Sequence, residues 1–249
     1  MWECGGVGVG VRLAIGLPHI GKFSGKFLDC YVGMRKPAEG YRLLRVGGAP
    51  VDMARNELVR KFLAGGGDWL LQIDSDMGFA RESLARLMGV AERRGLKMVS
   101  ALCFTRYVPP LPAVFRGVTR VREDGREFLR IRCQETMAWL EAHPEAIEEC
   151  PCVLDPAPED ALVRADGTGG AFLLVHREVF EALDEPWFKR DALKQGEDFF
   201  FFQNARRAGF ELWVDRSVIC GHEWGTEYIG PETFVAFQAV YPFERAIEM

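Results

Sequence analysis

The sequence predicts an α/β fold built on a mostly parallel sheet with helices on both faces. Short apolar runs alternate with amphipathic helical segments, a pattern typical of parallel sheets whose crossovers are helices. The chain has 249 residues, 48% hydrophobic and 27% charged, which allows a sizeable core and argues against disorder. One apolar run also ends in an acidic turn, where open sheets of this class bind ligands.

The first half of the chain carries most of this alternation. Residues 11–17 form a short apolar run closed by Pro18, which predicts a buried first strand. Apolar residues at helical spacing predict a helix over 51–64, ended by three consecutive glycines. The other elements expected here are a weaker strand at 41–46, strands at 69–73 and 97–104, and a helix at 82–94.

The middle of the chain, roughly residues 109–165, breaks this alternation with repeated prolines. A charged hairpin-like stretch around 123–125 and a helical stretch near 135–142 are expected within it. The core then resumes, and the elements expected there are a strand at 170–176 with a short helix after it, a helix at 197–208, and short terminal strands at 211–214 and 218–220.

Composition excludes several classes of protein. The 31 Lys and Arg against 36 Asp and Glu give a net charge of −5, so we expect no nucleic-acid partner. No apolar run of about 18 residues is present, so no transmembrane helix is expected. The seven scattered cysteines favour a reducing, cytoplasmic location over a disulfide scaffold. Three of them could supply metal thiolates, although their spacing matches no common zinc pattern: Cys133, Cys150 and Cys152.

The acidic turn after the strand at 69–73 is an Asp-x-Asp triplet, Asp74 to Asp76. Because residues i and i+2 of a strand point the same way, these two carboxylates can share one divalent cation. Carboxylate oxygens suit Mg²⁺ or Mn²⁺, with phosphates completing the shell. The competing interpretation is a solvated turn whose Asp residues cap the next helix, and position alone leaves both open.

A second acidic pair, Glu197 and Asp198, begins the helix expected at 197–208. Either carboxylate could act as the general base that accepts a proton from an attacking hydroxyl. A helix N-terminus lowers the pKa of a carboxylate, so such a base would be weak at rest. Stabilisation of the helix dipole alone is the competing interpretation.

Two further side chains are candidates for a site. His222 follows Gly221 directly after the strand expected at 218–220, and a neutral imidazole there could complete a Mn²⁺ shell or be structural. Arg55, early in the helix expected at 51–64, offers a planar fork for phosphate or carboxylate, or is an exposed helix charge. The glycine-rich run 5–10 precedes the first strand rather than following it, which disfavours a dinucleotide-binding fold.

The order and spacing of these motifs resemble family 2-like glycosyltransferases of the GT-A fold. The matching segments are Leu13–Pro18, Ala54–Val59, Asp68–Met77, Gly169–Phe172, Gly196–Asp198, Ala208–Phe210, and Val214–Asp215 leading to Gly221–His222. The resemblance covers about residues 11–108 and 168–225. It implies one GT-A-type domain with a mostly parallel nucleotide-binding sheet and a small mixed sheet on the acceptor side. The donor-binding half would span about 11–108, an insertion 109–165, and the acceptor and catalytic half 166–249.

The resemblance also implies the chemistry. A sugar would pass from a nucleotide-diphosphate-sugar donor to an acceptor hydroxyl, with Mn²⁺ or Mg²⁺ as cofactor and inversion favoured over retention. Carried over residue by residue, Asp76 and His222 would bind the metal, and Asp74 the metal or the ribose. Arg55, Gly169 and Gly170 would lie beside the donor. Asp198 would be the base, with Glu197 as the second choice.

Other functions remain open at this stage. A sugar nucleotidyltransferase also uses Asp and Mg²⁺ in an α/β sheet, and a non-catalytic protein could bind a nucleotide sugar without turning it over. The acceptor is not indicated. The apolar stretch 233–243 could be a core helix, a homodimer surface or a peripheral membrane contact, with the first two favoured.

Overall fold

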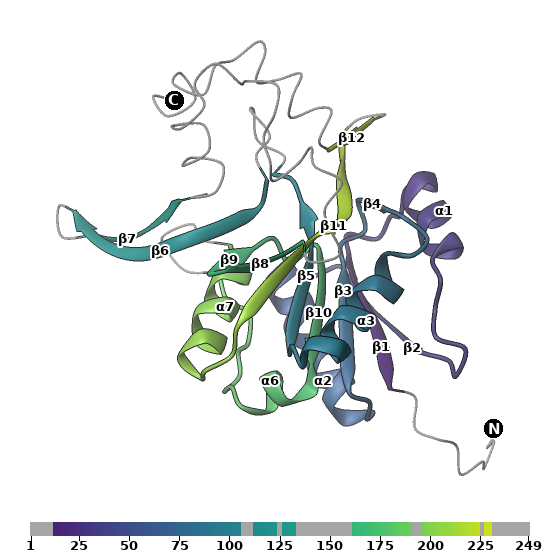
Figure 1. Ribbon diagram of the computed structural model, residues 1–249, viewed down its shortest axis with the longest axis horizontal. Coiled ribbons are helices and arrows are strands. Elements are labelled where there is room, and N and C mark those ends of the chain that lie inside the picture. The colour runs from purple at the N-terminus through teal and green to yellow at the C-terminus, as the bar shows by residue number, and fades with distance from the viewer. Residues whose placement is uncertain are drawn as a thin grey trace.

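A nine-stranded mixed sheet runs through the centre of the protein (Figure 1). The computed structural model describes residues 12–105, 112–123, 126–132, 161–190, 196–224 and 227–230. Strand order across the sheet is β12-β11-β5-β10-β3-β1-β2, and β4 and β8 also pair with β11. The fold class predicted from the sequence is therefore confirmed.

The parallel part of the sheet comes from the apolar runs of the sequence. Its members are β1 (Leu13–His19), β2 (Arg42–Gly47), β3 (Trp69–Ile73), β5 (Met98–Cys103) and the first part of β11 (Leu212–Trp224). Every residue of β3 and β5 is buried, as expected for central strands covered on both faces. The predicted strands at 41–46, 69–73 and 97–104 are confirmed to within one residue at each end.

One central strand runs against the others. β10 (Phe172–His176) lies between β3 and β5 and pairs antiparallel with both. Its residues alternate between the two faces, so that Leu173 and Val175 join one core and Phe172 and Leu174 the other. The sequence predicts this strand but not its direction, because a continuous apolar run is the same in either orientation.

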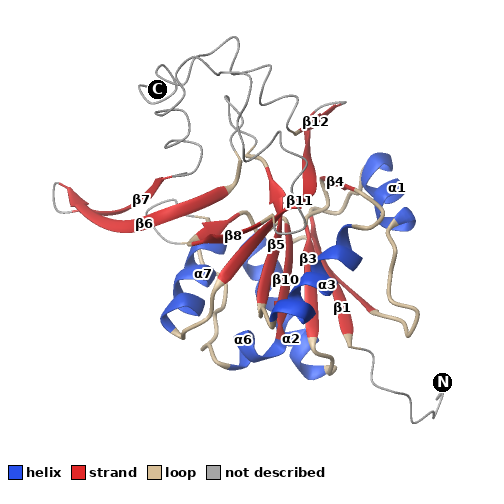
Figure 2. Cartoon of the chain, viewed as in Figure 1, coloured by secondary structure: helices blue, strands red, loops and turns tan. Residues whose placement is uncertain are grey.

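Helices cover both faces of the sheet (Figure 2). One face packs against α2 (Val51–Ala64), α6 (Arg177–Glu181) and α7 (Glu197–Arg207), and the other against α1 (Gly25–Gly33) and α3 (Ser83–Arg94). α1 is a helix that was not expected from the sequence. Ser24 caps this helix by accepting from the Phe27 N–H at 3.0 Å, and Phe27 is fully buried. A capping serine ahead of an apolar residue is a signal that was present in the sequence.

The insertion expected at 109–165 contributes to both sheets. β6 (Val114–Glu123) and β7 (Arg126–Arg132) form the predicted charged hairpin, and β6 also pairs with β9 (Gly167–Thr168) in a small second sheet. β8 (Leu162–Ala165) instead pairs with β11 in the main sheet. Several predicted features lie outside the described residues: the run 5–10, the helix near 135–142, the cysteine cluster at 133–152 and the apolar stretch 233–243.

The two short terminal strands predicted at 211–214 and 218–220 are one long strand, β11, with an irregular register between Asp215 and Ile219. Beyond the irregularity, β11 pairs with β4 (Met77–Phe79) and β12 (Glu227–Ile229). This long strand thereby joins the centre of the sheet to the segment that follows the Asp-x-Asp triplet. None of the described helices has the length and apolarity that crossing a membrane requires.

Candidate functional site

A cavity of about 600 Å³ lies where β1, β3 and β5 end. Its wall combines the residues after these strands with the start of α7 and the second sheet, which is the position that open α/β sheets use for ligands. Six of the candidates from the sequence line this cavity: Asp74, Asp76, Gly169, Glu197, Asp198 and His222. These residues come from widely separated segments of the chain and meet at one place, whereas Arg55 and Gly170 are not part of the described lining.

Asp76 and His222 are brought together by the pairing of β4 with β11. Met77 lies opposite His222 in this ladder, and the Glu223 N–H donates to the Asp76 carbonyl at 2.7 Å. The His222 Nε2 is then 3.6 Å from an Asp76 carboxylate oxygen, while its Nδ1 is 2.8 Å from the Phe104 carbonyl oxygen. Because a carbonyl only accepts, Nδ1 carries a proton. In the neutral imidazole the Nε2 lone pair then faces Asp76, the arrangement found in histidines that bind metals.

These two side chains fit a cation that a ligand also coordinates. Within the described part of the chain, no three His, Cys, Asp or Glu side chains are grouped closely enough to hold a metal by themselves. Asp76 and His222 offer one oxygen and one nitrogen, a donor set suited to Mn²⁺ or Mg²⁺ when phosphate oxygens and water supply the remaining ligands.

Arg55 lies behind the cavity rather than in its wall, with only 2% of its surface exposed. All three guanidinium nitrogens donate to protein oxygens: Nε to Glu197 at 3.1 Å, Nη1 to Gln72 and to the Gly170 carbonyl at 3.1 Å each, and Nη2 to the two Asp74 oxygens at 2.8 and 3.0 Å. Of the two roles that the sequence left open for its planar fork, Arg55 binds carboxylate in this structure.

Asp74, the first acid of the triplet, is held by this guanidinium, and a quarter of its side chain is exposed. Burial raises the pKa of Asp74, and the neighbouring positive charge of Arg55 opposes that rise. Its backbone N–H donates to the Ala171 carbonyl at 2.9 Å. Both ends of this residue are therefore fixed, whereas the carboxylate of Asp76 is turned toward His222.

Glu197 and Asp198 begin α7, whose following residues fix it in the core. Phe201 is buried with its ring centroid 4.7 Å from that of Phe188, as the aromatic run after the acids predicts. The Asp198 carboxylate accepts from the Gly170 N–H at 3.1 Å and the Phe199 N–H at 2.9 Å. It folds back over Gly196, where a Cβ would lie 2.4 Å from its oxygen.

The pKa of Asp198 is raised to about 6. Burial is the largest cause, and the adjacent charge of Glu197 adds to it, while Arg55 and the two backbone N–H donors act in the opposite direction. The lowered pKa expected from the helix N-terminus is therefore wrong for this residue, because desolvation outweighs the helix dipole. A carboxylate with a pKa of about 6 is well matched to accepting a proton near neutral pH.

The two adjacent glycines have different surroundings. Among the residues that the structure describes, a Cβ on Gly169 would come near the Ala113 Cβ alone, at 3.8 Å, and Gly169 lines the cavity. A Cβ on Gly170 would lie 3.2 Å from the Arg55 guanidinium. Space for a ligand beside Gly169 agrees with the expectation from the sequence, whereas at Gly170 the close neighbour is Arg55.

The described lining of the cavity is strongly acidic. Four carboxylates, from Asp74, Asp76, Glu197 and Asp198, face it together with one guanidinium, that of Arg190. Arg55 compensates two of these charges from behind. An anionic ligand such as a diphosphate would be repelled at the Asp76 end unless a cation entered with it.

Three lining residues were missed by sequence reasoning: His19, Arg190 and Phe115. His19 ends β1, so the rule that ligands bind at the carboxyl ends of strands could have identified it. Arg190 lies two residues after Phe188, whose backbone N–H and carbonyl both bind the Asn56 amide, at 3.0 and 2.7 Å. Phe115 begins the second sheet and packs against Phe199, with ring centroids 5.2 Å apart, a contact that no local pattern indicates.

No family model matches the chain, and no curated protein matches it. Many solved structures resemble it in three dimensions, A197 from STIV and GalNAc-T7 among them. A197 from STIV is 16% identical with a TM-score of 0.58, and the match covers 90% of this chain and 92% of that one. GalNAc-T7 with UDP, GalNAc and Mn²⁺ is 14% identical with a TM-score of 0.54, and the match covers 95% of this chain and 49% of that chain. At these identities the likeness concerns the fold, and the chain has an α/β fold of GT-A type.

Proposed function

We propose that this protein is a metal-dependent glycosyltransferase that moves a sugar from a nucleotide-diphosphate-sugar donor to an acceptor hydroxyl. The observation that carries the proposal is the pair formed by Asp76 and an imidazole whose Nδ1 is committed to a carbonyl, facing the same cavity as Asp198. GalNAc-T7, a neighbour in fold, was crystallised with a nucleotide diphosphate and Mn²⁺, which supports this class of ligand.

Asp76 and His222 would hold the divalent cation with the diphosphate of the donor. When bound, the cation would neutralise the negative charge that develops on the departing diphosphate. The acidic lining described above explains why the donor needs it, since four carboxylates would otherwise disfavour the phosphates. The side chain of Arg190 is 62% exposed, so its guanidinium can donate to a phosphate oxygen.

Asp198 would accept the proton of the acceptor hydroxyl as that oxygen attacks the sugar. With a pKa of about 6 it is mostly ionised at pH 7, and its two backbone N–H partners hold it in one orientation. A general base contributes about 10²- to 10⁴-fold to the rate of such a step. Gly169, with open space beside it, would leave room for the sugar.

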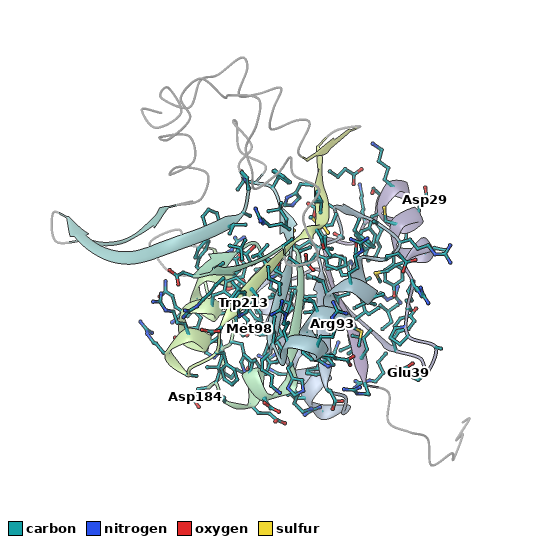
Figure 3. The ribbon with its side chains drawn as sticks, in the orientation of Figure 1. Asp29, Glu39, Arg93, Met98, Asp184 and Trp213 are labelled. Carbon is teal, nitrogen blue, oxygen red and sulfur yellow. The ribbon has the colours of Figure 1, made fainter. Side chains whose placement is uncertain are left out.

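The test is the thermal stability of the purified protein with UDP, GDP, CDP and dTDP, each with and without Mn²⁺. A ligand at 100 times its dissociation constant stabilises the folded state by about 2.7 kcal/mol. We expect one diphosphate to stabilise the protein only with metal, and Asp76→Ala and His222→Ala to abolish that effect. Asp184→Ala and His176→Ala are matched controls outside the cavity lining, and Figure 3 shows Asp184 at the edge of the molecule.

Two outcomes would overturn the proposal. If no nucleoside diphosphate stabilises the wild-type protein with metal, the donor site is wrong. If a nucleotide binds with metal but the protein transfers no sugar from any matching nucleotide sugar, to water or to an added hydroxyl, the non-catalytic binding protein is the better description. Release of pyrophosphate from a sugar phosphate and a nucleoside triphosphate would instead favour the nucleotidyltransferase.

A further inference from the structure

Glu197 and Asp198 are adjacent in the chain, yet their carboxylates have different partners. Glu197 is 7% exposed and accepts from the Arg55 Nε at 3.1 Å, with the Arg190 Nε 3.7 Å from its other oxygen. Asp198 accepts only backbone N–H groups in the contacts described above. Geometry therefore distinguishes the two acids: among the described residues, Glu197 contacts two guanidinium groups and Asp198 accepts from backbone N–H groups.

Arg55 links Glu197 to the opposite side of the cavity. The same guanidinium binds Asp74 through Nη2 and the Gly170 carbonyl through Nη1, and the N–H of Gly170 binds Asp198. One residue, Gly170, is thus held between Arg55 and Asp198, by its carbonyl on one side and its N–H on the other. A change at Glu197 would be transmitted to Asp198 both through the electric field and through this shared residue.

We propose that Glu197 is a positioning residue: paired with Arg55, it is a fixed buried charge that orients and tunes Asp198 and does not itself exchange protons with substrate. This inference rests on the proposed function for the identity of Asp198 as the base. The geometry behind the inference does not rest on the proposed function, because the contacts among Glu197, Arg55 and Gly170 involve no ligand.

The charged groups around Asp198 act in opposite directions. Glu197, on its own helix, raises the pKa of Asp198, whereas Arg55, from α2, lowers it together with the N–H groups of Gly170 and Phe199. Arg190 faces Glu197 from the cavity side. Removing the charge of Glu197 should therefore lower the pKa of Asp198, and removing that of Arg55 should raise it.

Glu197→Gln is the informative variant, because the amide oxygen can still accept from the Arg55 Nε while the charge is gone. The pKa of Asp198 can be followed without any turnover, by carboxyl ¹³C NMR of protein labelled at Asp and assigned by the signal lost in Asp198→Asn. We expect the titration of Asp198 to move from about 6 toward the ordinary carboxylate range in Glu197→Gln. Glu211→Gln, an exposed glutamate paired with Arg164, should leave it unchanged.

Arg55 supplies the second arm of the test. Arg55→Gln should move the titration of Asp198 upward, and Arg55→Lys, which keeps the charge, should restore it in part. An unchanged titration in Glu197→Gln would overturn the inference, as would a Glu197→Gln protein in which Asp198 titrates higher. If Arg55→Gln fails to fold, the titration of Asp198 in Glu197→Gln is by itself enough to support or overturn the inference.

Turnover gives an independent check once a donor is known. In Glu197→Gln the acidic limb of the pH profile of kcat should move to lower pH, with KM for the donor unchanged and measurable activity retained. Loss of all activity at every pH, with donor binding intact and the titration of Asp198 unmoved, would make Glu197 the base and overturn the inference. Failure of nucleotide binding in the wild type would refute the proposed function but leave the NMR result interpretable.

Discussion

The two acidic pairs of the cavity divide in the same way. In each pair one carboxylate binds Arg55: Asp74 after β3, and Glu197 at the start of α7. The other carboxylate of each pair contacts different groups: Asp76 lies beside His222, and Asp198 accepts from the Gly170 and Phe199 N–H groups. A single buried arginine thus pairs with one acid of each pair.

The difference between the two remaining acids lies in what they face. Asp76 lies 3.6 Å from the His222 Nε2, the nitrogen that does not face the Phe104 carbonyl. Asp198 accepts from two backbone N–H groups, and its burial raises its pKa to about 6. In the proposed function, the Asp76 side would therefore hold the ligand and the Asp198 side would exchange the proton.

The largest effect that would separate the two sides is on turnover. Asp198→Asn should lower kcat by about 10²- to 10⁴-fold, because an amide cannot accept the proton, while the metal-dependent stabilisation by nucleotide persists. Asp76→Ala should instead lose that stabilisation. Asp184→Asn is the control for a lost aspartate charge, since Asp184 is exposed and outside the cavity lining. Loss of nucleotide binding in Asp198→Asn would erase the distinction between the two sides.

Both acidic pairs depend on the Arg55 guanidinium, so the loss of Arg55 should cause the largest change in folding stability. Arg55→Met should lower the free energy of unfolding in urea by about 3–5 kcal/mol, because it leaves buried carboxylates without a counter-charge. Arg60→Met, on the same helix, removes a half-exposed arginine that pairs with Glu57 and Glu185. That control should lose about 1 kcal/mol or less. Equal losses in the two variants would show that Arg55 is no more important than a surface arginine.

The Asp198 side alone should also produce a pH dependence of stability. Because the pKa of Asp198 is raised in the folded state, its protonated form stabilises the fold below about pH 4, and this contribution is lost as the pH rises through about 6. The loss amounts to about 3 kcal/mol. In chelator, the unfolding free energy of Asp198→Asn relative to wild type should therefore increase between pH 4 and 7. A constant difference across this range would contradict the raised pKa.

The smallest effect concerns the adjacent glycines that join the two sides. Gly170→Ala puts a methyl group 3.2 Å from the Arg55 guanidinium, and should cost about 1–3 kcal/mol as the cluster shifts. Gly169→Ala meets only Ala113 among the described residues, at 3.8 Å, and should leave the unfolding free energy nearly unchanged. Thermal denaturation of both variants in chelator measures the difference. If Gly169→Ala destabilised the protein more than Gly170→Ala, the close contact between residue 170 and Arg55 would not be the cause of the loss.

Much of this arrangement could be predicted from the sequence, because its signals are local. The apolar runs of β1, β3 and β5 predict buried strands, and the acids after β3 and at the start of α7 are visible as motifs. His222 was visible as a motif after a short apolar run, but it lies within β11, and its proximity to Asp76 comes from the pairing of β11 with β4. A fold of GT-A type was expected on the same motifs.

The parts that the sequence did not predict depend on contacts between distant segments. Arg55 looks like any arginine on a helix until Glu197, 142 positions later, is placed against it. The pKa of Asp198 has the wrong sign when only the helix N-terminus is considered, because burial by the rest of the cavity is not a local property. The direction of β10 is also set by its neighbours and not by its own residues.

The antiparallel β10 has a consequence for the order in which the protein can be assembled. β3 and β5 lie close together in the sequence, with β4 and α3 between them, yet each pairs with β10, which the ribosome makes about seventy residues after β5. Until then one edge of β3 and both edges of β5 are unpaired, because β11, the other partner of β5, is made later still. A nascent chain with unpaired strand edges and two unfinished cores is prone to association with other chains. The middle of the sheet is therefore closed late in synthesis, by the strand that follows Gly170, the residue that connects Arg55 to Asp198.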